Sequence, residues 1–569
     1  MKNCFFYILW TCIALNCFAV PFSGKADRSN LHERMYVQTD KSVYLAGEPV
    51  LMKLLTTDDE NIPLVFSKVG YAELIRDSIA ILQIKVELTN GTGSGQMVLP
   101  VNLPSGYYRL IAYTQFMRNE GASVFFEKTI AVINTFQSDY QPIENNSKSE
   151  PVISNDRETE ASVISLNPNK ATYTTRERGE MIINGLPENI YTLSVSIAGK
   201  EGISIPEPEK SNTAINEFPK QTDPFLPEYE GPIITGKIIN NETGNPLPMN
   251  METSKIKLSP VIAFPGDKIW FFSGKISETD HRVLFFTSGN PGTKEIATVL
   301  YNSGEKYHIE IQSPFVNRFK PKPLPALRVD SSCYDQLLSR SVALQVFRYF
   351  SKDSSEIQNI SSSYLKIKPS SSYRLDDYTR YTTMAEVFTE IIINARFHKN
   401  SGKQELEVLI KRSSNYSYGY PLVLLDGVPI SDHEAIYNYD PRLVERINIY
   451  DNSYVLGSFL FDGIIELKTY RGLHQNLNLN TSSKIIQYET PQAPYRFETP
   501  DYSNEKNRHS IMPDSRHTLL WNPDLRSDGQ DTIRVPFDTS DLTGEFQATV
   551  EGITKDGKIV YATATFKVE

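Results

Sequence analysis

Cysteine is nearly absent from this chain of 569 residues. Three of its four cysteines (Cys4, Cys12 and Cys17) lie within the first twenty residues, and only Cys333 lies elsewhere. Beyond the first twenty residues a single cysteine cannot form an intramolecular disulfide, so the stability of this part of the chain must come from hydrophobic cores. The eight histidines are scattered, with no H-E-x-x-H and no Cys-His clustering, which argues against a zinc site. We expect no metal and no other cofactor.

Long apolar runs are missing beyond the N-terminus. The one candidate extends from Phe5 to about Ala19, after a positive residue and before small residues as far as Ala26. It is shorter than the roughly 20 residues of a spanning helix, and the pattern is typical of a signal peptide. We expect residues 1–19 to be a signal peptide, cleaved possibly as late as residue 26. A membrane anchor and a lipoprotein modified at Cys17 are the alternatives.

Net positive charge is also missing. The chain has 68 acidic and 58 basic residues, which argues against nucleic acid or anionic lipid as the main partner. Its 31 tyrosines and 28 phenylalanines stand beside 34 prolines and 30 glycines, a mixture that suits short strands and turns. The length implies about three to five domains.

A period-two pattern runs through residues 30–140. In "ERMYVQTDKSVYLAGEPVLMKLLTTD" apolar residues alternate at Met35 and Val37 and again from Val50 to Leu54, around the turn "LAGEP". The following segment, "ILQIKVELTNGTGSGQMVLPVNLPSGYYRLIAYTQF", gives further strands separated by Gly- and Pro-containing turns. Short strands at this spacing predict a β-sandwich.

The start of this region resembles a known motif. "YVQTDKSVYLAGEPV" is similar to the D-K-x-x-Y-x-x-G-E-x-V opening of the macroglobulin-type domains of alpha-macroglobulins. The matching positions are Asp40, Lys41, Tyr44, Gly47, Glu48 and Val50. We interpret these motif residues as structural, with Lys41 and Tyr44 stabilising a turn. A second, weaker match to the same motif has Lys170, Tyr173 and Glu180 at comparable spacing. This match predicts a second small β-sandwich at residues 160–205.

Residues 206–230 are rich in proline and charge without sustained periodicity, and they are predicted to be a linker. The next stretch, "GPIITGKIINNETGNPLP", resembles the start of the regulatory-like sandwich often found ahead of plug domains. The matching residues are Gly236, Gly244, Pro246 and Leu247. We therefore expect a regulatory-like β-sandwich at residues 231–320.

The segment "YDQLLSRSVALQVFRYF" predicts a packing helix at residues 333–352. Its expected buried stripe has apolar side chains at helical spacing. The stripe consists of Leu338, Val342, Val346 and Phe350, widened by Leu337 and Phe347. Cys333, just before it, is interpreted as a buried small residue or a helix-start neighbour.

Residues 375–472 combine helix and strand signals. Thr383 and Glu386 form a capping box ahead of apolar residues at helical spacing. In "PLVLLDGVPISD" the pair Asp426–Gly427 predicts a tight turn between two apolar arms. Asp440 is a predicted N-cap with Pro at the first helical position.

This order of elements resembles the plug domain of TonB-dependent receptors. The motif residues matched are Pro421, Asp426, Gly427, Pro429, Val444, Glu445, Ile447, Gly457, Gly463, Ile465, Thr469 and Gly472. The resemblance implies structural or recognition roles for them. A barrel of that family needs 22 strands of about 10 residues, and 97 residues follow Gly472, so we expect no import by this chain alone.

Residues 473–515 are predicted to be a linker, and residues 516–569 a C-terminal β-sandwich segment with strands at 531–537, 544–554 and 559–568. The tail resembles the W-x-P-x-L-x-T-D-x-x-G segment of alpha-macroglobulins. It matches at Trp521, Pro523, Leu525, Asp528 and Gly529. The predicted fold is mainly β: a multidomain string of immunoglobulin-like, macroglobulin-like β-sandwiches with a smaller α+β plug-like domain.

Signatures of catalysis are missing. The thioester motif G-C-G-E-Q of alpha-macroglobulins is absent, since Cys333 lies in "DSSCYDQ", and no G-x-S-x-G elbow occurs. We expect no enzyme, but a binding or docking scaffold in the periplasm or outer membrane of a Gram-negative bacterium, with an envelope protein as partner, possibly an outer-membrane barrel. Two alternatives are a plug supplied to a separate barrel and a thioester-free protease inhibitor with a bait segment at residues 491–517.

Overall fold

The computed structural model is mainly β and contains several sandwich-like modules, which confirms the predicted fold class. Residues 33–569 belong to one compact unit. The structure describes residues 32–137, 141–143, 164–200, 202–203, 205–206, 224–248, 258–266, 270–289, 295–303, 305–330, 333–350, 368–412, 415–472, 476–527 and 529–569. The predicted signal peptide and most of the linker predicted at 206–230 lie outside these residues.

The first sandwich packs a three-stranded sheet, β1-β3-β6, against a five-stranded sheet, β2-β8-β7-β4-β5. The alternating residues Met35, Val37 and Val50 are buried as predicted. Tyr71 and Tyr113 are buried with their hydroxyls bonded to Glu228 and Glu73, as buried hydroxyls require. Its strands are β1 (Arg34–Thr39), β2 (Val43–Leu45), β3 (Pro49–Thr57), β4 (Val69–Arg76), β5 (Ile79–Glu87), β6 (Thr92–Val98), β7 (Gly106–Tyr113) and β8 (Phe126–Ile133).

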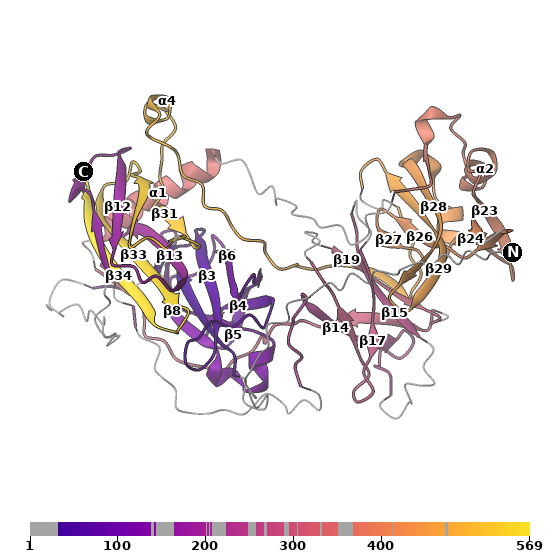
Figure 1. Cartoon of the computed structure of the whole chain (residues 1–569), viewed down its shortest axis with the longest axis horizontal. Coiled ribbons are helices and arrows are strands. Elements are labelled where there is room, and N and C mark those ends of the chain that lie inside the picture. Colours follow the sequence, from indigo (N-terminus) through magenta and orange to yellow (C-terminus); the bar gives the residue numbers. More distant parts are fainter. Residues whose placement is uncertain are drawn as a thin grey trace, which may run out of the picture. The chain divides into compact units, whose positions relative to one another are not determined.

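The second sandwich is built from two distant parts of the chain. Its sheets are β10-β12-β32 and β11-β34-β33-β13-β31, and Figure 1 shows the yellow C-terminal strands beside the purple β12 and β13. The strands are β10 (Ser165–Pro168), β11 (Thr172–Tyr173), β12 (Arg178–Asn184), β13 (Ile190–Gly199), β31 (Thr518–Asn522), β32 (Thr532–Asp538), β33 (Gly544–Thr554) and β34 (Ile559–Val568).

This pairing differs from the prediction of separate sandwich segments at 160–205 and 516–569. Each part supplies strands to both sheets and side chains to one apolar core, so neither part alone could cover its apolar face. The strands predicted within the tail are confirmed, because β33 and β34 have the expected bounds.

The third sandwich consists of the sheets β16-β15-β19-β30 and β17-β18-β14-β20. The strand β30, at the edge of the first of these sheets, lies within the segment predicted to be a linker (473–515). There Ile485 and Ile486 pair with Ala297 and Ile296 of β19. The strands are β14 (Ile233–Asn240), β15 (Ser259–Phe264), β16 (Trp270–Ser273), β17 (Lys275–Ile276), β18 (Arg282–Phe286), β19 (Glu295–Tyr301), β20 (Tyr307–Ile311) and β30 (Ser483–Gln487).

We call residues 371–472 the plug-like module, and they lie in the chain between β20 and β30. The same stretch of chain also contains Arg328–Asp330 and Tyr334–Phe350, which pack against other parts of the fold. The module has a five-stranded mixed sheet, β22-β28-β29-β26-β27, and a three-stranded sheet, β23-β24-β25. Its elements are β22 (Ser371–Arg374), α2 (Met384–Glu390), β23 (Ala395–Asn400), β24 (Lys403–Arg412), β25 (Asn415–Gly419), β26 (Leu422–Leu425), β27 (Val428–Pro429), α3 (Glu434–Tyr437), β28 (Val444–Leu456) and β29 (Phe459–Thr469).

Local predictions within this module are confirmed. The capping box of Thr383 and Glu386 starts α2. Asp426 and Gly427 have φ of 49° and 82°, which is the type I′ geometry that suits a two-residue hairpin. Asp440 caps a short 3-10 helix that starts at Pro441.

The predicted packing helix is α1 (Tyr334–Phe350). In its predicted buried stripe Leu337 is buried as expected, but the prediction is wrong for Leu338 and Val342. Leu338 and Val342 are 44% and 53% exposed, whereas Leu337 and Arg340 are buried. The helix packs through Leu337 and Leu344 against an apolar cluster that includes Leu45, and Arg340 pairs with Glu48. The side chains at 346–350 lie outside the described residues.

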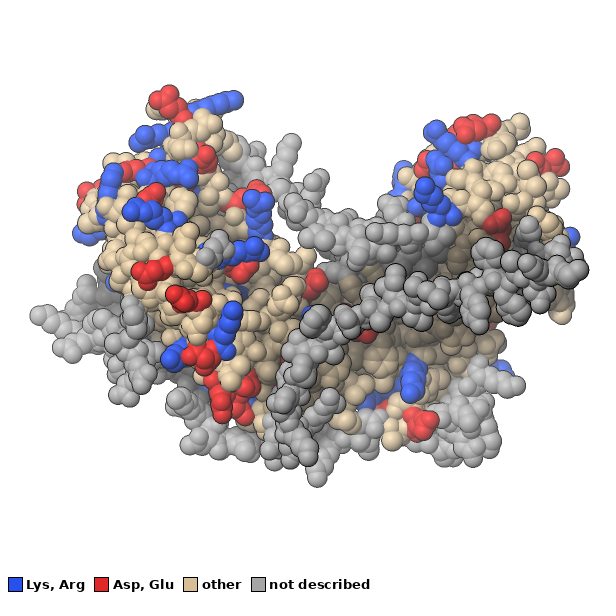
Figure 2. Space-filling view, in the orientation of Figure 1, with Lys and Arg blue, Asp and Glu red and all other residues tan. Residues whose placement is uncertain are grey.

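The remaining short strands are β9 (Gln141–Ile143) and β21 (Arg328–Asp330), which pair in parallel, and the remaining short α-helix is α4 (Glu505–Arg508). Short 3-10 helices also occur at Phe116–Asn119, Ala122–Val124 and Leu375–Asp377. No helix among the described residues has the length and hydropathy needed to cross a membrane. On the face shown in Figure 2, acidic and basic side chains are interspersed over the described surface.

Candidate functional site

The macroglobulin-like residues meet at the turn between β1 and β3. Tyr44 donates its hydroxyl hydrogen to Asp40 Oδ1 (2.8 Å), and the Leu45 amide donates to Glu48 Oε2 (3.1 Å). These two hydrogen bonds join residues within the turn and stabilise its conformation. Lys41 lies 3.3 Å from Glu48 Oε2.

Two distant elements complete this cluster. Arg340 of α1 donates to both Glu48 oxygens, at 2.9 and 2.5 Å, and Thr518 of β31 donates to Asp40 Oδ2 at 2.7 Å. We call the six residues Asp40, Lys41, Tyr44, Glu48, Arg340 and Thr518 the ion-pair joint. It ties the first sandwich to α1 and to the second sandwich.

The ion-pair joint is buried, and its charges are paired. Burial raises the pKa of Glu48, but Arg340, Lys41 and the Leu45 amide outweigh it and lower the pKa to about 2. Glu48 is therefore an anion at every physiological pH. A buried carboxylate held by arginine and lysine is suited to fixing structure, not to accepting a proton.

The second sandwich repeats this turn. Tyr173 donates to Asn169 Oδ1 (2.6 Å), the Thr174 amide donates to Glu177 Oε2 (2.7 Å), and Lys170 pairs with Glu177. The strands repeat as well, because β2 and β11 each pair in parallel with the last strand of their sandwich. The glutamate of the motif is thus Glu177, four residues after the tyrosine. The match of Glu180 is wrong.

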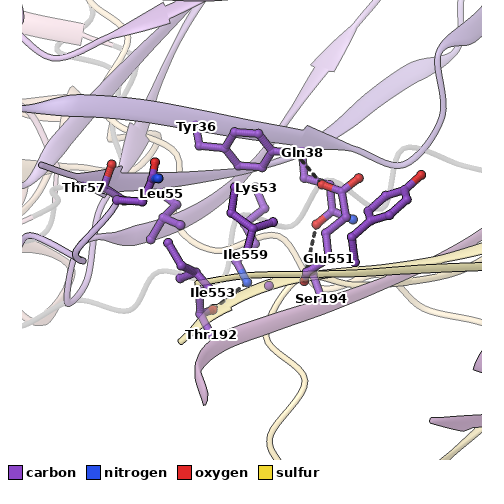
Figure 3. A pocket seen from close by; sticks show the side chains of 13 residues that line it. Tyr36, Gln38, Lys53, Leu55, Thr57, Thr192, Ser194, Glu551, Ile553 and Ile559 are labelled. Carbon is purple, nitrogen blue, oxygen red and sulfur yellow. Dashed lines mark hydrogen bonds between the residues drawn. The ribbon is translucent and has the colours of Figure 1, made fainter. Parts of the chain in front are cut away.

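A small cavity of about 60 Å³ lies between β1 and β3 of the first sandwich and β13, β33 and β34 of the second. Figure 3 shows Gln38 and Lys53 on one side and Thr192 and Ser194 on the other. Lys53 donates to Thr192 Oγ1 at 2.6 Å, and burial lowers its pKa to about 8, with Asp524 and Glu551 opposing. This volume is sufficient for a few ordered waters.

The Asp426–Gly427 turn joins the plug-like module to the third sandwich. Asp426 accepts hydrogen bonds from the Thr469 amide (2.7 Å) and hydroxyl (2.6 Å), and its own carbonyl accepts from the Gly266 amide (3.0 Å). A Cβ at Gly427 would lie 2.9 Å from the Gly266 nitrogen. Only glycine allows this approach, so the plug-like motif places two backbones in contact.

The other plug-like residues are spread over the module and do not form one polar site. Gly457 also faces the third sandwich, because a Cβ there would lie 2.0 Å from Ser273 Oγ. The remaining positions are Pro421 and Pro429, buried on either side of the Asp426 turn, Glu445, half-buried in β28, Gly463, against Val408 in β24, and Gly472, at the exposed end of the module.

An exposed apolar surface lies on the plug-like module. Val455 and Leu460 face each other across β28 and β29 and are 73% and 66% exposed. On the same face of β29, Asp462 packs against Gly419 at the end of β25. Tyr416 and Tyr418 of β25 are also exposed, and no described strand pairs with the outer edge of β25. Tyr416 and Tyr418 pair with Lys411 and Leu409, so they lie on the face of their sheet opposite to Gly419. We call the four exposed residues Tyr416, Tyr418, Val455 and Leu460, which lie on two faces of the module, the docking surface.

Two features bear on chemistry. Among the described residues, no group of three or more His, Cys, Asp or Glu side chains is placed to hold a metal ion. Cys333 forms no disulfide within the described part of the chain and is half-buried against the apolar cluster that contains Leu337.

The suggested bait segment is partly anchored in this structure. Arg176 donates to the carbonyls of Ser510 (2.5 Å) and Met512 (2.8 Å), while Ile511 between them is 97% exposed. The side chain of Ile511 is therefore accessible, but the backbone on either side of it is held.

Sequence reasoning missed three residues that complete the turns: Arg340, Thr518 and Glu177. Arg340 gave no signal, because its position 292 residues after Glu48 carries no local pattern. Glu177 could have been found, since the spacing from Tyr44 to Glu48 equals that from Tyr173 to Glu177.

Comparison with known proteins gives distant similarities. No family model and no curated protein matches the sequence. Among solved structures, Salmonella alpha-2-macroglobulin reacted with methylamine is 9% identical over 94% of this chain and 23% of its own, with a TM-score of 0.16. Escherichia coli alpha-2-macroglobulin activated by porcine elastase is 11% identical over 94% and 44%, with a TM-score of 0.23.

The Escherichia coli adhesin FdeC is 10% identical over 53% of this chain and 66% of its own, with a TM-score of 0.15. The chain thus spans less than half the length of the two macroglobulins.

Proposed function

We propose that this chain is a non-catalytic, exported protein of the Gram-negative cell envelope that acts as a docking scaffold associated with the outer membrane. Its string of sandwiches presents the plug-like module to a protein partner. The docking surface is the observation that carries this proposal.

The chemistry of the docking surface suits a protein partner. Exposed edge strands and exposed apolar pairs invite association, and folded proteins generally cover or charge them. Tyrosine is enriched at protein interfaces because its ring is large and rigid and its hydroxyl is polar. The outer edge of β25 offers backbone groups to a strand of the partner, which is the geometry of β-strand addition.

Site-specific photo-crosslinking in intact envelopes tests the proposal. A benzophenone amino acid at Tyr416, which is 65% exposed, is expected to capture a recurrent partner that mass spectrometry identifies. The same group at Tyr229, which is 55% exposed on another part of the chain, is the matched control. The paired change Val455→Ser and Leu460→Ser should weaken the capture, whereas Val98→Ser with Val101→Ser should not. Capture at Tyr416 no greater than at Tyr229 would overturn the proposal.

A second candidate function is a plug-like module supplied to a separate outer-membrane barrel. The motif around Asp426 and the strand order of the module favour it. The same experiment separates the two functions, because a captured barrel protein in stoichiometric yield supports the second candidate. Captured partners without any barrel support the scaffold.

A further inference from the structure

A polar cavity of about 330 Å³ lies where loops of the third sandwich meet the plug-like module. Its walls come from the end of β19, the start of β24, the residue after β25, the β27–α3 loop and the segment before β30. A second cavity, of about 450 Å³, shares Glu305, Asp432 and Asn480 with it. Volumes in this range are typical of small-molecule sites. We call the first of these the polar cavity.

His433 supplies an unused hydrogen-bond donor in the wall of the polar cavity. Its side chain is 3% exposed, and its Nδ1 accepts a hydrogen bond from the Leu406 amide (2.9 Å). Burial lowers the pKa of His433 to about 4, with Asp432 opposing, so the ring is neutral at neutral pH. Since Nδ1 is the acceptor, the proton is on Nε2. This Nε2 has no partner among the described residues.

Asn480 supplies an unused acceptor. Its amide nitrogen donates to Ser431 Oγ (3.2 Å), while its buried Oδ1 has no partner among the described residues. A buried polar group that stays unpaired destabilises the fold. Both His433 and Asn480 line the polar cavity, so a ligand that both accepts and donates hydrogen bonds would remove two penalties at once.

The remaining wall is polar and acidic, with one aromatic platform. Asp432, Glu305 and Glu405 outnumber the single cation, Lys403, which lies 3.8 Å from Asp432. The Tyr420 ring stacks on His433 with ring centroids 4.9 Å apart, and 42% of its side chain is exposed.

We propose that the polar cavity binds a neutral saccharide. Each sugar hydroxyl both accepts and donates a hydrogen bond, which matches His433 Nε2–H, Asn480 Oδ1 and the carboxylates together. The C–H face of a sugar ring is apolar and suits the exposed part of the Tyr420 ring. Three carboxylates disfavour an anionic ligand, and the polar wall disfavours a lipid. This site is distinct from the docking surface.

A glycan array probed with the full-length protein tests the proposal. We expect binding to at least one neutral glycan, followed by calorimetric titration of that glycan in solution. Tyr420→Ala and Asn480→Ala should each lower the affinity by about tenfold or more. Tyr378→Ala, at an exposed tyrosine outside both the cavity wall and the docking surface, should leave it unchanged.

Three results would overturn the saccharide proposal. They are the absence of binding to any neutral glycan at millimolar concentration, binding that survives both Tyr420→Ala and Asn480→Ala, and binding confined to amines such as spermidine. Partner capture at Tyr416 is measured separately, and changes in the docking surface should not affect the glycan titration. Failure of one proposal is therefore distinguishable from failure of the other.

Discussion

The turns at residues 40–48 and 169–177 have the same local design and different surroundings. In both, a tyrosine hydroxyl bonds the side chain four residues earlier, and a glutamate accepts the amide of the residue after the tyrosine. In the first turn the glutamate is buried and bound by Arg340. In the second its partner is Lys170, whose side chain is 54% exposed.

This comparison separates two contributions to the stability of such a turn, its internal hydrogen bonds and an ion pair with a distant element. The internal hydrogen bonds depend on residues within nine positions, so both copies have them. The buried ion pair depends on α1, which only the first copy contacts. Since exposed ion pairs contribute about 0–1 kcal/mol and broken buried ones cost about 3–5 kcal/mol, equal substitutions should have unequal effects.

The largest expected difference is between Glu48→Ala and Glu177→Ala. Glu48→Ala leaves Arg340 buried without its carboxylate, whereas Lys41 keeps Asp40, and should lower the free energy of unfolding by about 3–5 kcal/mol. Glu177→Ala should cost about 1 kcal/mol, mostly for its hydrogen bonds to Thr174. Urea unfolding followed by fluorescence, to which the buried Trp521 contributes, measures both. Equal losses would refute a special role of the ion-pair joint.

The change Arg340→Met should cost about 2–4 kcal/mol, because it leaves the Glu48 carboxylate buried with Lys41 as its one nearby cation. The double variant Glu48→Met with Arg340→Met should be more stable than the sum of the single changes predicts. A double-mutant cycle from the same unfolding experiment gives the coupling. Additive losses would contradict direct pairing across α1.

Acid should weaken the first turn through Glu48. Its pKa in the folded protein is about 2, below the ordinary 4.5, so this carboxylate stabilises the fold above pH 4.5. That contribution, about 3 kcal/mol at most, is lost as pH falls from 4.5 through 2. Glu48→Gln should therefore flatten the pH dependence of unfolding in this range. A wild-type slope retained in Glu48→Gln would assign the acid sensitivity to other groups.

The smallest expected effects are those of Tyr44→Phe and Tyr173→Phe. Each removes one hydroxyl donor from a buried ring without changing its shape. Loss of the bond to the Asp40 carboxylate should cost about 2 kcal/mol, and loss of the bond to the Asn169 amide about 1 kcal/mol. Thermal unfolding should rank them in this order. The reverse order would show that the charge of the acceptor does not determine how much each tyrosine hydrogen bond contributes to stability.

Local signals in the sequence were sufficient for several elements. The capping box at Thr383, the I′ turn at Asp426–Gly427 and the alternation around Met35 each involve residues a few positions apart. Their hydrogen bonds form within one turn or one hairpin, so sequence order alone specifies them.

Predictions failed where the partner is distant in the sequence. The stripe was wrong at Leu338 and Val342, because Leu337 and Arg340, on another side of α1, make its contacts with distant residues. The strand β30 was missed, and its residues were assigned to a linker. A strand of five residues is recognisable only through its pairing with β19. His433 gave no sign of an unpaired donor, since its environment comes from several separate loops.

The sequence by itself determined the mainly β class, the turn chemistry and the absence of any disulfide outside the first twenty residues, because these follow from composition and short-range spacing. The tertiary structure alone decided that residues 165–199 and 518–568 share two sheets, that Arg340 completes the ion-pair joint, and that a polar cavity forms beside His433. Each of these depends on contacts between residues far apart in the chain, and no local pattern encodes which distant strand or side chain arrives there.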